Sequence, residues 1–195
     1  MIRGNPKKYY KKGISKWKAF FYRKMLPLRL QEYIDCNRQK HLYGDSNILI
    51  IHVPKVAGRS FNDMLYKTEH SLHITAKNYL KFFSRHLNNN FSFAMMRCPV
   101  ERFISSFYFL KNGGTKDCRV DYRSIYDNEI FNSIETFIEN YLNQEGDLSI
   151  DHVLMPQHHY FSEDENILVD HIGILDRVDL TLNILNKYSQ SILNL

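Results

Sequence analysis

The sequence predicts an α/β domain with a mostly parallel central sheet, because short apolar runs alternate with segments of helical spacing. Two runs, residues 47–53 and 91–96, have the character of buried strands. Each is followed by an unusual turn and then by apolar residues three or four positions apart. No internal repeat or low-complexity linker divides the chain, and 195 residues suit one domain with a substantial core.

The first half of the chain supplies the first predicted strand and two helices. Residues 47–53 are rich in isoleucine and lie between Gly44-Asp45-Ser46 and Pro54, which is typical of a buried strand. Phe61, Met64 and Leu65 then share one side of a predicted helix, and residues 76–86 form a second one.

The second half begins with the strand at residues 91–96, which ends at Arg97-Cys98-Pro99. Pro99 suits the first turn of a helix, and Gly113-Gly114 would end that helix. Helices are also expected over residues 129–142 and 180–193, with a short strand at 167–169 between them.

Composition fits an ordinary globular protein, since 44% of the residues are hydrophobic and 24% are charged. Three widely spaced cysteines, Cys36, Cys98 and Cys118, form no C-x-x-C pair. They therefore signal neither a zinc site nor a disulfide framework, and a reducing compartment fits best.

Positive charge is concentrated at the N-terminus. Residues 1–30 hold ten Lys or Arg and no acid, so with a net charge of +5 overall the other residues carry −5. A nucleic-acid-binding domain would spread its basic charge over a folded face, so we expect no nucleic-acid partner. The pattern permits a local anionic partner such as a membrane surface.

The basic segment has the spacing of an amphipathic helix. Ile14, Trp17, Phe21 and Met25 recur at helical intervals, with lysines and arginines between them. Such a helix can lie in a membrane interface, and it can equally pack on the domain or remain a solvated tail. No apolar run approaches the roughly 20 residues of a membrane span or the core of a secretory signal. We expect a cytoplasmic protein, peripheral to the inner membrane if residues 1–30 bind lipid, with the domain in residues 31–195.

The turn "HVPKVAGRSF" at residues 52–61 joins the first strand to its helix. Ligands of such sheets bind beyond the carboxyl ends of the strands. Small Ala57 and Gly58 let a ligand approach the backbone, Ser60 opens a helix whose dipole favours anions, and Lys55 and Arg59 add positive charge. These features favour a phosphate site; the alternative is a tight connection with solvated cations.

The second turn, "RCPVERFISSFYFL" from residue 97, has Arg97 at the end of a strand and Ser105 two turns into the following helix. An arginine fork and a hydroxyl suit a second phosphate. Arg97 could instead pair with an acid, and Ser105 could face solvent.

Together the two turns resemble those of the PAPS-dependent carbohydrate sulfotransferases, the group of the heparan sulfate 2-O-sulfotransferases and many bacterial relatives. The resemblance rests on "PKVAGRSF" at 54–61, "RCPVERFISSFYF" at 97–109, "DHVLMPQHHYF" at 151–161 and "LVDHIGILDRVDLTLNIL" after it. It spans about residues 47–186 and implies a P-loop-like, three-layer α/β/α sandwich. Relatives usually continue beyond the position of Leu195, so the domain is expected to be short at its carboxyl end.

The resemblance implies the sulfation of a sugar hydroxyl, on a polysaccharide or glycolipid, by 3′-phosphoadenosine 5′-phosphosulfate, without a metal. Lys55 would meet the bridging oxygen, and His73 would act as the base, with His70 as its competitor. The remaining residues implied by the resemblance would bind the 5′-phosphosulfate (Ala57, Gly58, Arg59, Ser60 and Phe61), the 3′-phosphate (Arg97 and Ser105) and the acceptor (His152 and Gln157).

Two other functions stay open at this point. The chain could bind adenosine phosphates with little or no catalysis, since Val56 and Arg59 stand where the family usually has hydroxyl residues. It could also be a P-loop kinase or ATPase, because residues 167–170, "ILVD", have the outline of a Walker B strand. Against that alternative, the pattern G-x-x-x-x-G-K is missing.

Overall fold

The chain folds into two compact units. The computed structural model describes residues 9–10, 25–44, 46–68, 72–114, 119–120, 128–143 and 152–193. One unit, the sheet unit, consists of Leu26–Cys98 and Gln157–Leu195, and the other, the helical unit, of Met1–Met25 and Pro99–Pro156. The two predicted turns both begin in the sheet unit.

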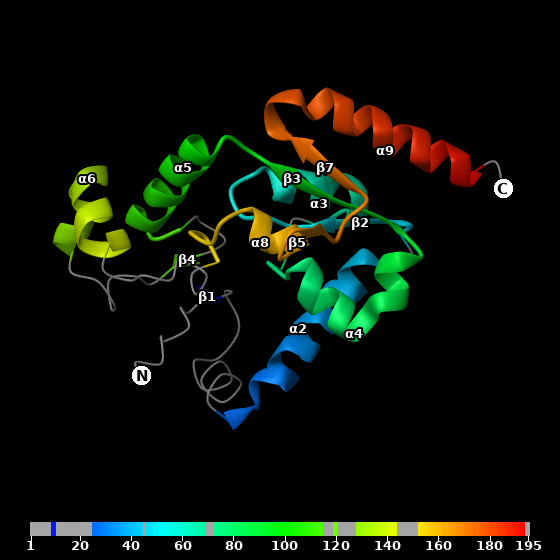
Figure 1. Cartoon of the computed structure of the whole chain (residues 1–195), viewed down its shortest axis with the longest axis horizontal. Coiled ribbons are helices and arrows are strands. Elements are labelled where there is room, and N and C mark those ends of the chain that lie inside the picture. The colour runs from blue at the N-terminus through cyan, green and yellow to red at the C-terminus, as the bar shows by residue number, and fades with distance from the viewer. Residues whose placement is uncertain are drawn as a thin grey trace. The chain divides into compact units, whose positions relative to one another are not determined.

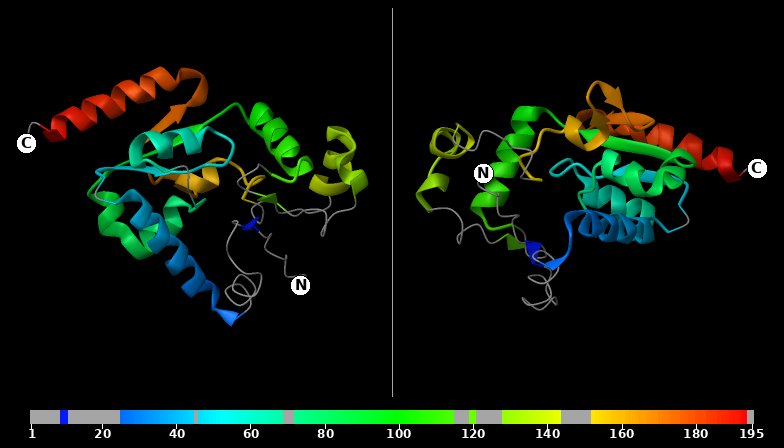
Figure 2. Two further views of the ribbon diagram at one scale, coloured as in Figure 1. Left: turned by 180° about the vertical axis from the view of Figure 1, so that it is seen from behind. Right: turned by 60° about the horizontal axis from the view of Figure 1, so that its bottom comes forward.

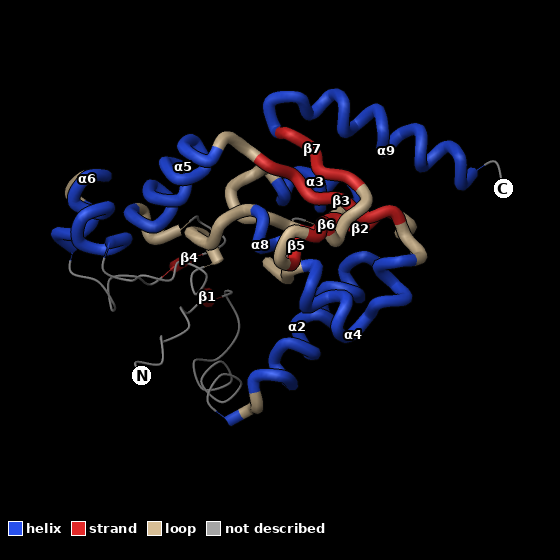
Figure 3. The backbone as a smooth tube through the Cα atoms, viewed as in Figure 1, coloured by secondary structure: helices blue, strands red, loops and turns tan. Residues whose placement is uncertain are grey.

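The centre of the sheet unit is a sheet of three parallel strands (Figure 3). The strands lie in the order β2 (Ile48–Ile51), β3 (Phe91–Met96) and β7 (His171–Ile174). All three end at the same edge of the sheet because they are parallel. The turns that follow β2 and β3 therefore start side by side.

Helices cover both faces of this sheet. On one face lie α3 (Gly58–Tyr66) and α9 (Val178–Leu193), and on the other α4 (Ala76–Asn88) and α8 (His158–Phe161). Figure 1 shows α3 behind the sheet and α8 in front of it, and Figure 2 shows them from the other side. The ring of Phe61 packs on that of Phe93, with 5.6 Å between their centroids. The predicted three-layer α/β/α sandwich is confirmed.

Two tyrosines cap the outer edge of β2. The Tyr66 hydroxyl accepts a hydrogen bond from the Ile50 N–H (3.1 Å) and donates one to the Ile48 carbonyl (2.8 Å). The Tyr43 hydroxyl, from the end of α2 (Leu28–Tyr43), donates to the Ile50 carbonyl. These side chains take the place of a further strand, since backbone groups at an open edge need partners.

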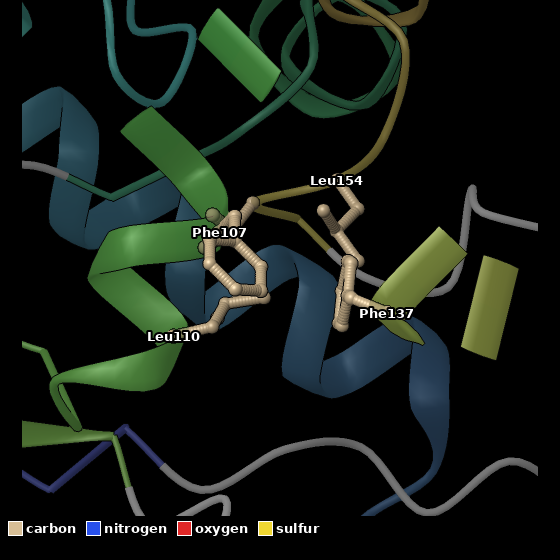
Figure 4. Packing of buried hydrophobic residues seen from close by; sticks show 5 residues of the cluster. Phe107, Leu110, Phe137 and Leu154 are labelled. Atoms are coloured by element: carbon tan, nitrogen blue, oxygen red, sulfur yellow. The ribbon is translucent and has the colours of Figure 1, made fainter. Parts of the chain in front are cut away.

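The helical unit is built around α5 (Pro99–Lys111). Its other elements are η1 (Asn128–Phe131), α6 (Ile134–Phe137), η2 (Ile138–Leu142) and the pair of short antiparallel strands β1 (Tyr9–Tyr10) and β4 (Arg119–Val120). Figure 4 shows its core, in which Phe107 and Leu110 of α5 pack with Phe137 and Leu154. None of the described helices is long and apolar enough to cross a membrane.

Several predicted elements need correction. The strand expected at residues 167–169 is wrong: β6 (Asn166–Ile167) pairs only with β5 (Ser162–Glu163) in a small hairpin, and the third strand of the sheet is β7. The single helix expected over residues 129–142 is interrupted at Ser133, whose side chain caps the start of α6 by accepting from the Thr136 N–H at 3.1 Å.

Of the N-terminal segment, residues 1–30, the structure describes only residues 9–10 and 25–30. The amphipathic helix predicted around Ile14 to Phe21 lies outside the described residues. Helix α2, which the sequence did not predict, begins at Leu28 directly after Pro27, so it spans the expected domain boundary at residue 30. A deletion that leaves the sheet unit whole should therefore end at residue 24 or before.

Candidate active site

The turn between β2 and α3 has an unusual backbone. Lys55 has a φ of 68° and Ala57 a φ of 62°, both in the left-handed region that side chains other than glycine rarely adopt. Each such residue costs about 1 kcal/mol. Left-handed Ala57 is followed directly by the first helical residue, Gly58, and such an alternation of left- and right-handed residues is typical of anion-binding nests. The turn therefore has the geometry of an anion-binding nest at a helix N-terminus.

The side chains of this turn divide into buried and exposed positions. Val56 is 1% exposed, so its side chain lies in the core, on the protein side of the turn. Ala57, Arg59 and Ser60 are exposed, and Lys55 is partly exposed. Val56, which stands where the family usually has a hydroxyl residue, therefore packs in the core. The side chains of Lys55 and Arg59 are accessible at the surface of the turn.

Phe61 was predicted among the residues that hold the donor. Its side chain is 5% exposed and packs on Phe93, so the ring belongs to the core of the sheet unit. Its backbone N–H donates to the Ala57 carbonyl at 3.4 Å, so the structure gives no support to a donor contact at Phe61.

His52 lies beneath the turn and fixes its shape. The imidazole is 5% exposed, and a Cβ atom at Gly58 would lie 1.9 Å from its Cδ2 atom. Burial, together with the nearby His73 and Arg59, lowers the pKa of His52 well below the ordinary value. The ring is therefore neutral, and it occupies the space that any larger residue at position 58 would need.

His73 comes to the same end of the sheet. Its Nδ1 atom lies 3.2 Å from the carbonyl oxygen of His52, and the two rings are 4.5 Å apart between centroids. A carbonyl oxygen only accepts hydrogen bonds, so Nδ1 carries the proton in this contact and Nε2 is the accepting atom of the ring. This is the tautomer that a general base requires.

Arg97 is held at the end of β3 by its main chain. The Arg97 N–H donates to Oε1 of Gln157 at 2.9 Å, and Nε2 of Gln157 donates to the Arg97 carbonyl at 2.8 Å. Gln157 is 6% exposed. The contact between Gln157 and the acceptor stays a prediction, and the double contact of Gln157 with Arg97 is a feature that the sequence did not predict.

Ser105 and His152 belong to the helical unit. Ser105 lies partly exposed on α5, and His152 is exposed just ahead of the buried Val153. The neighbouring Arg102 is 6% exposed, and its guanidinium donates to the carbonyls of Val153 and Met155. Arg102 thus anchors the chain before Pro156, while the roles of Ser105 and His152 stay predictions.

The opposite end of the sheet holds Asp170. Its carboxylate accepts from the backbone N–H of Ser92 at 2.8 Å and from the Ser92 hydroxyl at 2.7 Å, which ties the starts of β3 and β7 together. A Walker B aspartate would have to lie near the turn after β2, at the carboxyl end of the sheet. The geometry therefore contradicts the reading of residues 167–170 as a nucleotide-magnesium strand. Within the described ranges, no three His, Cys, Asp or Glu side chains gather as a metal site requires.

Residues 42–189 match the sulfotransferase family, which covers most of the chain and both turns. The protein belongs to the sulfotransferase family. No curated protein and no solved structure is similar enough to this chain to count as a match. Membership supports transfer of a sulfuryl group as the class of reaction, with a sulfuryl donor as co-substrate.

In this sulfotransferase, the resemblance found in the sequence is confirmed at the level of the family and of the α/β fold. His52 is the residue of the site that sequence reasoning missed. Its position was a usable signal, because a histidine that directly follows the apolar run Ile48–Ile51 and precedes Lys55 by three positions must lie close to the turn.

Proposed function

We propose that the protein transfers the sulfuryl group of 3′-phosphoadenosine 5′-phosphosulfate to a hydroxyl of a carbohydrate. The observation that carries the proposal is the nest of Lys55 to Gly58 at the carboxyl end of β2, next to the turn at Arg97 after β3. A donor with phosphates at both its 5′ and 3′ positions needs two such anion sites. ATP would need only the first.

The proposed step moves a sulfuryl group in line between two oxygens. The bond from sulfur to the bridging oxygen breaks, a bond from sulfur to the acceptor oxygen forms, and negative charge grows on the bridging oxygen. Lys55 would meet that charge, while the backbone amides at the start of α3, with the side chains of Arg59 and Ser60, would hold the 5′-phosphate. Positioning and charge stabilisation would supply most of the rate, as in phosphoryl transfer.

The acceptor hydroxyl would lose its proton to His73. Its Nδ1–H contact with the His52 carbonyl supports this role, because it presents Nε2 as the proton acceptor. A sugar hydroxyl is a poor nucleophile while it keeps its proton, so a base at this end of the sheet is what the reaction needs. The acceptor class, a polysaccharide or glycolipid, rests on the resemblance of the turns to the carbohydrate sulfotransferases.

Calorimetry on the full chain tests the donor. We expect adenosine 3′,5′-bisphosphate to bind at least tenfold more tightly than adenosine 5′-monophosphate, since one charge-assisted hydrogen-bond set is worth about 1.5–3 kcal/mol. Equal affinity for the two, or tighter binding of magnesium-ATP, would contradict the proposal.

The basic segment of residues 1–30 would bring the enzyme to an anionic membrane surface, where lipid-linked glycans are accessible. Its ten positive charges and no acids support the idea, as each Lys or Arg near such a surface contributes about 1 kcal/mol. A cytoplasmic enzyme peripheral to the inner membrane would follow from this binding.

A further inference from the structure

The side chain of Gln157 binds the main chain of Arg97 at two points. It accepts from the Arg97 N–H at 2.9 Å and donates to the Arg97 carbonyl at 2.8 Å. These are the two contacts that a neighbouring strand would make with this residue. Since Gln157 is 6% exposed, the pair is shielded from water and holds its geometry.

The position of this pair matters because the sheet ends just before it. The last residues of β3 and β7 in register are Met96 and Ile174, and the chain leaves the sheet unit after Cys98. Beyond Met96 no strand of the sheet pairs with the described residues 97 and 98. Gln157, the residue at which the chain re-enters the sheet unit, thus extends the ordered backbone of β3 by one residue.

An arginine fork reads a phosphate only if its backbone is fixed, because a small rotation at the Cα atom moves the guanidinium by several ångströms. Resting on the function proposed above, we propose that Gln157 is the positioning residue that aims Arg97 at the 3′-phosphate of the donor. It thereby sets the preference of the enzyme for a 3′-phosphorylated nucleotide, without touching the nucleotide itself.

A comparison of two variants of the full chain tests this inference. Gln157→Met keeps the length of the side chain and removes both polar atoms. The matched control is Tyr66→Phe, which also removes one donated and one accepted contact with a strand backbone, at Ile48 and Ile50 on the far edge of β2. Calorimetry gives the affinity of each for adenosine 3′,5′-bisphosphate and for adenosine 5′-monophosphate, and thermal unfolding shows that each is folded.

We expect Gln157→Met to lower the ratio of the two affinities about tenfold while binding of the monophosphate changes less than about twofold. Tyr66→Phe should lose stability and keep the ratio. An unchanged ratio in Gln157→Met, or an equal loss of affinity for both nucleotides, would overturn the inference. If Gln157→Met does not fold, Gln157→Glu serves instead: it keeps an acceptor for the Arg97 N–H, sets an oxygen against the Arg97 carbonyl, and must also lower the ratio.

A different result of the same calorimetry would reject the proposed function. It fails if the unaltered protein does not prefer the bisphosphate at all, and the inference about Gln157 then falls with it. A strong preference in the unaltered protein that survives in both Gln157 variants rejects the inference and leaves the proposed function standing.

Discussion

A Cβ atom at Gly58 would lie 1.9 Å from Cδ2 and 2.1 Å from Nε2 of His52. The buried imidazole thus fills the space under Gly58, the first residue of α3. The shape of the turn between β2 and α3 depends on this fit, because the turn can close over His52 only if residue 58 has no side chain.

Gly58→Ala is therefore expected to destabilise the protein and to weaken donor binding together. The clash forces a shift of the turn or of the ring, and overpacking of this kind costs about 1–3 kcal/mol. Chemical denaturation and calorimetry measure the two effects. In the double variant with His52→Ala, part of the loss in stability should return, since the ring no longer occupies the space; strict additivity would show that the two residues do not interact.

Because Ala57 has a left-handed backbone, substitution by glycine should change the free energy of unfolding in opposite directions at Ala57 and at Ala76. Ala57→Gly should raise the free energy of unfolding by up to about 1 kcal/mol, because glycine adopts a φ of 62° without strain. Ala76→Gly, at the start of α4, should lower it by about 1 kcal/mol, as glycine does in an ordinary helix. A loss of stability in both variants would mean that Ala57 is not strained.

Three histidines give the stability a dependence on pH. Burial is the main cause that lowers the pKa values of His52, His86 and His171. An unfolded chain takes up protons on histidine below about pH 6.5, whereas the folded chain keeps these rings neutral to lower pH. The free energy of unfolding should thus be at its full value above about pH 6.5 and fall as the pH drops below it.

Denaturation at pH 7.5, 6.5 and 5.5 checks this dependence. His171→Asn should weaken it, since one of the three rings is then gone while the nearby Thr181 hydroxyl keeps a polar neighbour. Stability that rises between pH 6.5 and 5.5 would contradict the assignment of neutral, buried histidines.

The N-terminal segment allows a test of the membrane proposal that leaves the sheet unit whole. Deletion of residues 1–24 removes nine of the ten positive charges in residues 1–30 and ends before α2. Sedimentation with anionic vesicles should show binding of the full chain that weakens as salt rises and is lost in the deletion. Replacement of Lys7, Lys8, Lys11, Lys12, Lys16 and Lys18 by glutamine should have a similar effect. Vesicle binding that persists in both variants would contradict the membrane proposal.

Strands could be predicted from the sequence where they are continuous apolar runs. The sequence predicted β2 and β3 and the position of both turns, because these strands are buried on both faces and bounded by turn-forming residues, Gly44 and Pro54 around β2 and the asparagines at 88–90 and Pro99 around β3. It failed at β7, where the inward residue Gly173 faces Thr181 and Met95 so closely that a Cβ atom would lie 2.2 and 2.5 Å from them. With glycine at its packed position, β7 has only the separated Ile172 and Ile174 as apolar residues, which is too weak a signal to predict a strand.

Helix α2 was missed for a related reason. Its buried residues are Cys36, Gln39 and Tyr43, and all three make polar contacts: the Cys36 thiol donates to the Asn78 carbonyl at 3.5 Å, Gln39 accepts from the Leu72 N–H at 2.8 Å, and Tyr43 binds the edge of β2. Such a helix shows no apolar stripe. Similarly, the contact of Gln157 with the Arg97 main chain joins residues 60 positions apart, which no local pattern reveals.

Transfer of labelled sulfate is the measurement that tests the central claim most directly. The full chain, its Lys55→Ala variant and its Lys67→Ala variant are incubated with labelled 3′-phosphoadenosine 5′-phosphosulfate and a set of carbohydrate acceptors. Lys67 is the matched control, since it also has a left-handed backbone, with a φ of 53°, but lies at the other end of α3. We expect label on a carbohydrate with the unaltered chain and with Lys67→Ala, and a transfer rate lower by a factor of about 10²–10³ with Lys55→Ala. Transfer by Lys55→Ala at the unaltered rate would contradict this expectation.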